Sequence, residues 1–409
     1  MNTETVTPPA PPGPRPAPGV PASTRRFTID GDDQLERHLA QTCAKIMAGL
    51  HGLLPDRKLE AVLLGGGYGR GEGGVLPMPG GHRPYNDLEF YVGLRGNRHW
   101  NERLYHRRLE ILGEILTPQA GVELEFKIFS LAELARRPIN MFTYDLFSGH
   151  RWLLGHEGLL SGCQHHGAAD HLPGFEATRL LMNRCTGLLL ARDRLGCSPV
   201  KFTPADADFV RRNVAKAELA LGDAVLTVRG QYHWSCRKRH ERLLQLAHDE
   251  RSSLASWLNE VCYYHQVGTE FKLHPTRCDD SRDSLRRYHA EVTEMALRTW
   301  LWVESRRLGR GFRSALEYAE SPARKCGATS PVRNLVVNAK MFGARAFLAR
   351  DRSCHPRQRV MHALALLLWE PDVLTSPYLL RRVQAELKTQ VSSFADLVAA
   401  YRALWQQVN

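Results

Sequence analysis

A glycine-rich segment between two apolar stretches constrains this chain more than any other feature. Leu63 and Leu64 lead into GGGYGRGEGG at 65–74, and a second apolar stretch at 86–92 reads NDLEFYV. Both stretches have the character of strands. Successive side chains on a strand point to opposite faces, so Asp87 and Glu89 should project together while the apolar residues between them pack behind.

These two carboxylates predict a magnesium site. Adjacent carboxylates on a rigid strand repel each other unless a cation lies between them, and Mg²⁺ is commonly held by one or two carboxylates together with substrate phosphates. Gly66 and Gly67 leave room for backbone amides to approach a phosphate. Together, the acids Asp87 and Glu89 and the glycines predict a metal-dependent nucleotide site with Mg²⁺ as its cofactor.

The same residues resemble a known family. GGYGRGE at 66–72, followed by Asp87-Leu88-Glu89, is similar to the signature of the DNA polymerase β-type nucleotidyltransferases, in particular the minimal and antibiotic nucleotidyltransferases. The resemblance covers about residues 28–165. It departs from the family pattern at Gly67, where serine is commoner, and in a longer gap before Asp87, with an apparent insertion at 75–81.

The resemblance implies a third carboxylate on a later strand. Residues 121–129, GVELEFKIF, alternate apolar and charged side chains as a strand does. Glu123 and Glu125 would share a face, and either could complete the catalytic set. Glu125 is favoured as the third metal ligand, because its spacing to the helix start at 130–134 is more like the family's. The segments 144–147 and 152–155 resemble the helix and turn that close the catalytic domain.

Two plainer interpretations compete with this site. Gly69-x-Gly71-x-x-Gly74 also fits a dinucleotide fingerprint, but that fold needs continued strand–helix alternation, and the later sequence has mostly helical periodicity. Alternatively, Asp87 and Glu89 are a solvated strand face beside a glycine-rich hairpin. The combination of glycine loop, paired acids and a further acidic strand favours the nucleotidyltransferase interpretation.

Composition and length predict two folded domains behind a tail. The chain has 409 residues, more than one typical core, and residues 1–23 are too rich in proline and alanine to form one. Nine scattered cysteines without paired spacing, no signal-peptide core and no membrane-length apolar run predict a cytoplasmic protein that does not associate with membranes. The net charge of +12 favours anionic partners.

The second half predicts helices. Apolar residues recur every three to four positions from about Gly174, with two stripes at 180–190 and 209–226 and further helices at 236–247, 282–307, 312–319, 331–349, 356–369, 375–388 and 393–407. The expected fold is α+β: a nucleotidyltransferase-type mixed sheet with helices at 24–165, followed by an all-α helical bundle at 166–409. The boundary is expected within 162–173.

By the same resemblance, the helical domain would close one wall of a cleft. Lys216 is the expected phosphate contact there, and Asn183, Arg184, Asn213, Asp223 and Tyr232 are further candidates. In the glycine loop, Tyr68 and Arg70 are expected to contact the nucleotide with Gly66 and Gly67. Glu72 has two possible structural roles, at the N-terminus of the next helix or in a pair with Arg70.

The implied reaction is transfer of a nucleoside monophosphate from an NTP, with ATP the first candidate, to an acceptor hydroxyl with release of pyrophosphate. A small molecule or a protein is the favoured acceptor. Two alternatives stay open: a catalytically weak nucleotide-binding or interaction module with the same fold, and a transferase directed to RNA. Nucleic acid is the less favoured partner because no RNA-binding motif is present.

Overall fold

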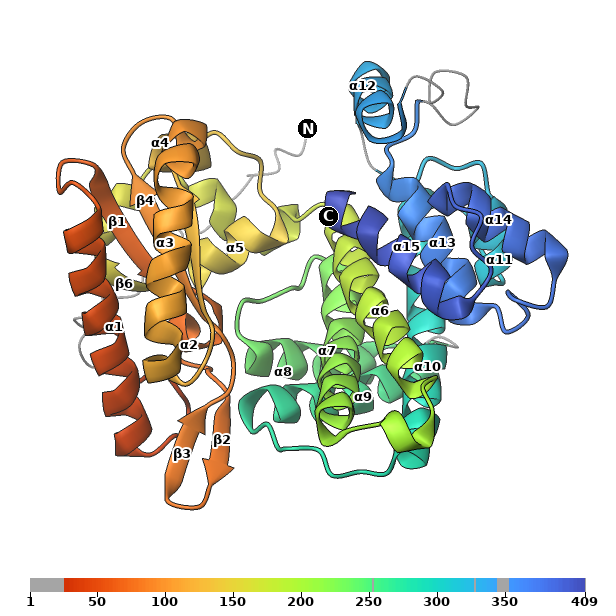
Figure 1. Cartoon of the computed structure of the whole chain (residues 1–409), viewed down its shortest axis with the longest axis horizontal. Coiled ribbons are helices and arrows are strands. Elements are labelled where there is room, and N and C mark those ends of the chain that lie inside the picture. Colours follow the sequence, from red (N-terminus) through yellow and green to blue (C-terminus); the bar gives the residue numbers. More distant parts are fainter. Residues whose placement is uncertain (1–25, 252–253, 327–328, 344–352, 409) are drawn as a thin grey trace, which may run out of the picture.

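The computed structural model describes residues 26–251, 254–326, 329–343 and 353–408. These residues form two main hydrophobic cores, one around a small β-sheet in residues 27–154 and one among the helices from Ala177 to Val408. We call these parts the sheet region and the helical region. They lie side by side, and the predicted Pro-rich tail at 1–23 is outside the described residues (Figure 1).

The sheet is mixed and has the order β5-β4-β1-β6. Strands β1 (Leu59–Leu64) and β4 (Leu88–Leu94) are antiparallel, and β5 (Leu124–Phe129) runs parallel to β4. These are the three strands expected from the apolar patterns. The segment 152–155, expected as a turn, lies mostly in a fourth strand, β6 (Arg151–Leu154), which pairs with β1.

Two long helices cover one face of the sheet. The helices α1 (Asp33–Leu53) and α3 (Arg98–Ala120) bury apolar residues such as Leu39 and Leu109 against Leu88, Phe90 and Val92. This packing uses the apolar alternate positions of β4, so Glu89 and Tyr91 must point to the opposite face. That face is partly covered by the short helix α5 (Met141–Ser148) through a small cluster of Leu63, Tyr91 and Leu146.

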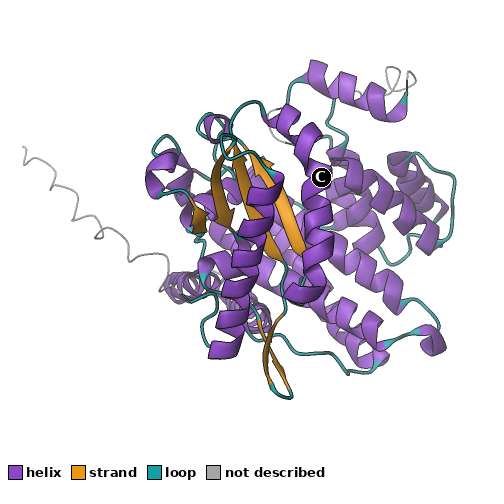
Figure 2. Ribbon diagram, turned by 60° about the vertical axis from the view of Figure 1, so that its left-hand side comes forward, coloured by secondary structure: helices purple, strands orange, loops and turns teal. Residues whose placement is uncertain are grey.

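The insertion before Asp87 forms a separate hairpin. Strands β2 (Val75–Met78) and β3 (Gly81–Pro84) pair with each other only. The hairpin is tied to the start of α1, where His82 donates its backbone N–H to Asp32 over 2.8 Å and the Asp32 N–H bonds the His82 ring over 3.0 Å. Figure 2 shows it extending beyond the sheet.

The helical region contains the predicted helices and one that the pattern did not reveal. The stripes at 180–190 and 209–226 lie in α6 (Phe175–Leu195) and α7 (Pro204–Val228), and the others are α8 (Cys236–Asp249), α10 (Arg282–Leu308), α11 (Ala315–Glu320), α12 (Pro331–Phe342), α13 (Arg357–Trp369), α14 (Pro377–Leu387) and α15 (Phe394–Val408). Helix α9 (Ala255–Leu273) was not predicted. The expected continuation of α12 through 344–349 lies outside the described residues.

Short elements complete the chain. Helices α2 (Gly66–Arg70) and α4 (Leu131–Leu134) follow β1 and β5, and 3₁₀ turns at 157–160, 164–167, 169–171 and 199–201 link the longer elements. None of the described helices has the length and apolar character that a membrane span requires.

The two regions are joined by buried polar contacts. The Glu72 carboxylate accepts hydrogen bonds from the Ser235 hydroxyl (2.5 Å) and the Cys236 N–H (2.9 Å) at the start of α8. Tyr232 donates to Asp145 on α5 over 3.2 Å. Through these contacts the acidic face of the sheet is held near α6 and α7.

Candidate functional site

Three carboxylates at one end of the sheet lie close enough to act on one another electrostatically. Asp87 directly precedes β4, Glu89 lies on β4, and Glu125 is the residue of β5 in register with Glu89. The Lys127 ammonium contacts Glu89 Oε2 and Glu125 Oε2, each at 3.0 Å, and the Tyr91 hydroxyl donates to Glu89 Oε2 over 2.5 Å. Glu89 and Glu125 therefore already share one internal cation.

Asp87 is the carboxylate of the three that makes no direct ion pair among the described residues. Reduced hydration at the junction of the two regions, together with the charges of Glu89 and Glu125, raises the pKa of Asp87. Glu89 behaves in the opposite way: burial alone would raise its pKa, but Lys127 and the Tyr91 hydroxyl lower it below the usual range. An added cation would be stabilised most next to Asp87.

Glu125 and Glu123, the two candidates for the third carboxylate, occupy different positions. Glu125 is half-buried on β5 beside Glu89, whereas Glu123 is exposed and precedes the strand. Glu123 contributes its backbone carbonyl, which accepts the Leu88 N–H over 2.9 Å. The described residues contain no ready-made cluster of three or more metal-ligating side chains. Mg²⁺ does not require one, since it retains waters and uses substrate phosphates as ligands.

The glycine turn lies directly against these acids. Gly66 has φ of 61°, and a Cβ atom there would come within 3.1 Å of Glu89 Oε1. At Gly65 a Cβ atom would lie 2.4 Å from the Tyr91 ring. Side chains at these positions would push the turn away from β4. The glycines are thus needed for close approach between the turn and the acidic face.

Tyr68 and Arg70, which were expected to contact the nucleotide, instead bind other parts of the protein. The Tyr68 side chain is completely buried, donates to the Gly74 carbonyl (2.8 Å) and accepts the Tyr85 N–H (2.9 Å), so it cannot contact a nucleotide in this conformation. Arg70 forms a largely buried ion pair with Asp145 on α5 at 3.1 Å. Its charge still acts on Glu89, whose pKa it helps to lower.

The helical region brings cations to the acidic face. Reduced hydration and the neighbouring Arg184 lower the pKa of Lys216 on α7, while Asp87 and Glu125 act to raise it. Burial lowers the pKa of Arg184 on α6, while Asp223, Tyr232 and, less strongly, Asp87 act to raise it. Neither side chain has a hydrogen bond or ion pair within the described part of the chain. Lys216 was expected to contact the phosphates of a nucleotide, and that contact stays a prediction.

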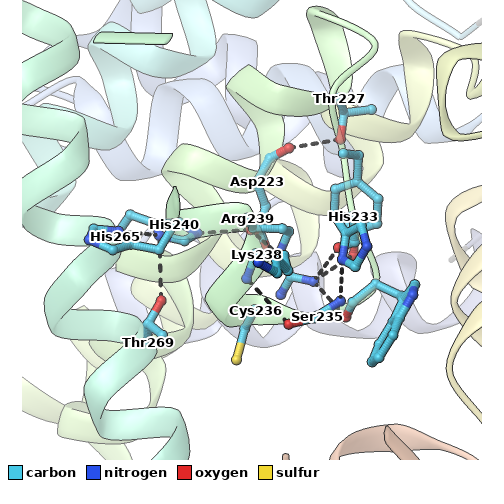
Figure 3. Close-up of polar contacts among 12 residues, drawn as sticks. Asp223, Thr227, His233, Ser235, Cys236, Lys238, Arg239, His240, His265 and Thr269 are labelled. Atoms are coloured by element: carbon cyan, nitrogen blue, oxygen red, sulfur yellow. Dashed lines mark hydrogen bonds and ion pairs between the residues drawn. The ribbon is translucent and has the colours of Figure 1, made fainter. Parts of the chain in front are cut away.

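Other candidates from the helical region have structural roles. Asp223 is buried between Arg239 (2.5 Å) and His265 (3.0 Å), and His265 in turn contacts His240 at 3.2 Å (Figure 3). Tyr232 is also buried and bonds Asp145.

Asn213 bonds the carbonyl of Phe209 within its own helix, and Asn183 has a buried side-chain oxygen without a partner in the described structure.

Sequence reasoning missed Lys127 and the partner of Glu72. Lys127 was visible as the single basic residue at an alternate position of an acidic strand, which is a signal for an internal counter-ion. The contact between Glu72 and the start of α8 joins residues more than 160 positions apart. No local pattern indicates such a pair.

A cavity of about 170 Å³ adjoins the acidic face. It continues along the same side of β4 and β5 under α4 and α5, and Lys127 forms part of both the cavity and the acid cluster. Its other walls include Tyr91, Ser130, Arg137 and Phe142. The lining combines aromatic rings with hydrogen-bonding groups, a combination typical of pockets for small organic groups.

Comparison with known proteins provides no relative for this chain. No protein-family model matches it, and neither a curated protein nor a solved structure shows significant similarity to it. The family resemblance of residues 28–165 therefore stays a hypothesis, and function has to be argued from the site.

Proposed function

We propose that this protein is a Mg²⁺-dependent nucleotidyltransferase that moves a nucleoside monophosphate from an NTP to a hydroxyl of a small molecule or a protein. The main support for the proposal is that carboxylates of the sheet region lie near cationic side chains of the helical region. Asp87, Glu89 and Glu125 lie on the sheet side, and Lys216 and Arg184 come from α7 and α6 without partners of their own in the described structure. Such a site suits a ligand that combines a cation with phosphates.

The donor set fits Mg²⁺. Asp87 and Glu89 supply hard carboxylate oxygens. Burial and the charges of Glu89 and Glu125 raise the pKa of Asp87 although Lys216 acts to lower it, so a bound cation would relieve repulsion among the three acids. Asp87 and Glu89 would hold the metal, with Glu125 beside them. When bound, Mg²⁺ would neutralise phosphate charge and, as a Lewis acid, polarise the phosphoryl oxygens so that the α-phosphorus is more easily attacked.

The residues of this chain would then position the reactants. Lys216 and Arg184 would hold the triphosphate, and the Gly66–Gly67 turn would let it approach Glu89 closely. The acceptor oxygen would form a bond to the α-phosphorus as the bond from that phosphorus to the β-phosphate bridging oxygen breaks and pyrophosphate leaves. Glu125 is the candidate to take the hydroxyl proton, and the adjacent cavity would receive the acceptor group.

A second candidate function is favoured by Lys127. Its ammonium already bridges Glu89 and Glu125 at 3.0 Å, as a metal ion would. A module that binds nucleotides weakly, or only a protein partner, would use such an internal cation in place of Mg²⁺. The substitution Lys127→Met distinguishes the two functions. In a transferase it should reduce Mg²⁺-dependent NTP binding, whereas in a module that uses Lys127 in place of Mg²⁺ it should create affinity for Mg²⁺.

The test is isothermal titration of the full chain with ATP, GTP, CTP and UTP, each with and without Mg²⁺. We expect Mg²⁺-dependent binding of at least one NTP, and loss of that binding in Asp87→Asn/Glu89→Gln. Glu60→Gln is the matched control, because Glu60 is a carboxylate on β1 that pairs with Arg95 at 3.0 Å. No NTP binding by folded wild-type protein would refute the proposal.

Activity needs its own measurement. NTP labelled at the α-phosphate would be incubated with pools of hydroxylated small molecules or with proteins, and pyrophosphate release would be followed together with label transfer. Label on an acceptor that depends on Asp87 supports the transferase. NTP binding without any transfer supports the nucleotide-binding module. Comparing Glu125→Gln with Glu123→Gln separates the two candidates for the third acid.

A further inference from the structure

Helix α3 carries an apolar stripe on its outer side. Trp100, Leu104, Ile111 and Ile115 are 41–62% exposed, although Tyr105 and Leu109 on the inner side of the same helix are buried. At 3.6 residues per turn, the four exposed side chains fall within an arc of about 60°. Scattered exposed apolar residues are ordinary, but an aligned stripe along a long helix marks an interaction surface.

The stripe faces away from the candidate site. Helix α3 packs on β5 and beside α1, on the sheet face opposite Glu89 and Glu125 (Figure 1). A partner on this surface would leave the acidic face accessible, with Arg98 at the start of α3 as the one residue of the helix that lines the cavity. The stripe therefore belongs to a separate function.

The spacing of the stripe is symmetric along the helix. The successive intervals between Trp100, Leu104, Ile111 and Ile115 are four, seven and four residues, so the pattern is the same in both directions. Two copies of α3 laid antiparallel would match Trp100 of each copy with Ile115 of the other, and Leu104 with Ile111. Self-complementarity of this kind is the requirement for a two-fold symmetric interface. We propose that this surface joins two copies of the chain through antiparallel α3 helices.

The charges beside the stripe support a second copy as the occupant. Along one flank the order is Arg103, Arg107, Glu110 and Glu114, basic toward the N-terminus and acidic toward the C-terminus. In an antiparallel pair the same flanks of both helices meet, so each Arg103 would face Glu110 and Glu114 of the other copy.

Within one chain these charges are only partly matched. Arg107 contacts both Glu110 (3.3 Å) and Glu114 (3.2 Å), while Arg103 lies over the Trp100 ring at 5.4 Å and has no ion pair among the described residues. In a parallel pair opposite flanks would meet, so Arg103 would face the other flank of the second helix and not Glu110 and Glu114. Charge complementarity thus selects the antiparallel arrangement.

The test is sedimentation of the full chain over a concentration series. We expect a reversible dimer with a dissociation constant in the micromolar range, because one helix pair lies at the small end of specific interfaces. Leu104→Glu should weaken the dimer at least about tenfold by placing a charge against Ile111 of the other copy. Leu244→Glu is the matched control, since Leu244 is an exposed leucine on α8 outside the stripe.

A charge exchange makes the test specific to orientation. Arg103→Glu alone should weaken the dimer, and so should Glu110→Arg/Glu114→Arg. The triple variant should recover affinity toward the wild-type value. All substituted side chains are exposed, and circular dichroism would confirm that each variant is folded.

The proposal is overturned if the wild-type chain stays monomeric at every concentration. It is equally overturned if a dimer forms that Leu104→Glu leaves intact, because the contact would then lie elsewhere. A dimer that the triple variant fails to restore, while both parental variants weaken it, would refute the antiparallel arrangement.

Discussion

The contact of Glu72 with α8 gives the sharpest stability prediction. Glu72 is 6% exposed and its carboxylate accepts two hydrogen bonds, from the Ser235 hydroxyl and the Cys236 N–H. Both donors belong to the first turn of α8, where unpaired N–H groups and the helix dipole favour a negative charge. Ser235 itself caps the helix by accepting the Lys238 N–H over 3.2 Å.

The expected loss can be estimated from these contacts. A hydrogen bond to a charged group contributes about 1.5–3 kcal/mol, and removing one partner of a buried ionic contact costs about 3–5 kcal/mol in total. Glu72→Ala should therefore lower the free energy of unfolding by about 3–5 kcal/mol. Glu72→Gln keeps the shape but turns an N–H₂ group toward one of the donors, and it should cost about 1–3 kcal/mol.

The carboxylate also predicts a pH dependence. Burial alone would raise the pKa of Glu72, but Lys272, Ser235 and Cys236 lower it below the usual 4.5. A carboxylate whose folded pKa is depressed stabilises the protein above its unfolded pKa. That contribution is lost as the pH falls through the folded pKa. The stability difference between wild type and Glu72→Gln should therefore be constant near neutral pH and shrink below about pH 4.5.

The assay is urea denaturation of wild type, Glu72→Ala, Ser235→Ala and the double variant. Because Glu72 and Ser235 are in direct contact, their effects should be non-additive by about 1 kcal/mol or more. Glu294→Ala is the control, since Glu294 is exposed on α10 and has no hydrogen bond or ion pair in the described structure. A change below about 0.5 kcal/mol for Glu72→Ala would refute the reasoning, because this is the range of ordinary surface substitutions.

Three further predictions concern the site. Asp87→Asn should raise the melting temperature slightly without Mg²⁺, because it removes the repulsion of Asp87 by Glu89 and Glu125, which solvent screens at this exposed position. A lower melting temperature would contradict this. Lys216→Met should weaken Mg²⁺–NTP binding about tenfold or more while leaving stability nearly unchanged, measured by titration and by urea denaturation. Tyr68→Phe should destabilise the protein by about 1–3 kcal/mol, because it leaves the Tyr85 N–H without its acceptor. The folded variant should retain its affinity for NTP. A loss of affinity without a loss of stability would show that the Tyr68 hydroxyl contacts the nucleotide.

Local patterns predicted the elements that carry the site. Strand β1 was evident as a short apolar run that ends at the glycine turn. Strands β4 and β5 were evident because alternation of apolar and polar residues survives wherever one sheet face is buried. The same rule correctly indicated that Glu89 lies on the face opposite Phe90. Most helices were predicted because an apolar stripe with a 3.6-residue period is needed to bury one side of a helix. Helix α9 escaped notice because its apolar residues are interrupted by polar ones such as His265 and Thr269, which are buried in the fold.

Side-chain roles were predicted less well than elements. Tyr68 was expected at the ligand because it lies in the glycine turn, but its ring is buried and its hydroxyl is satisfied by Gly74 and Tyr85. Arg70 was expected at the nucleotide and instead pairs with Asp145, which comes from a helix 75 positions later. In both cases a partner distant in sequence satisfies the polar group, and a single sequence does not reveal that partner.

What the sequence by itself determined is the presence of an acidic strand beside a glycine turn and a long helical second half. These depend on interactions between near neighbours, which the order of residues specifies directly. The tertiary structure alone decided that Lys127 bridges two of the acids, that Lys216 and Arg184 approach the third, and that Glu72 holds α8 in place. Charges act through space, so their effect on one another depends on distances that only the folded chain establishes.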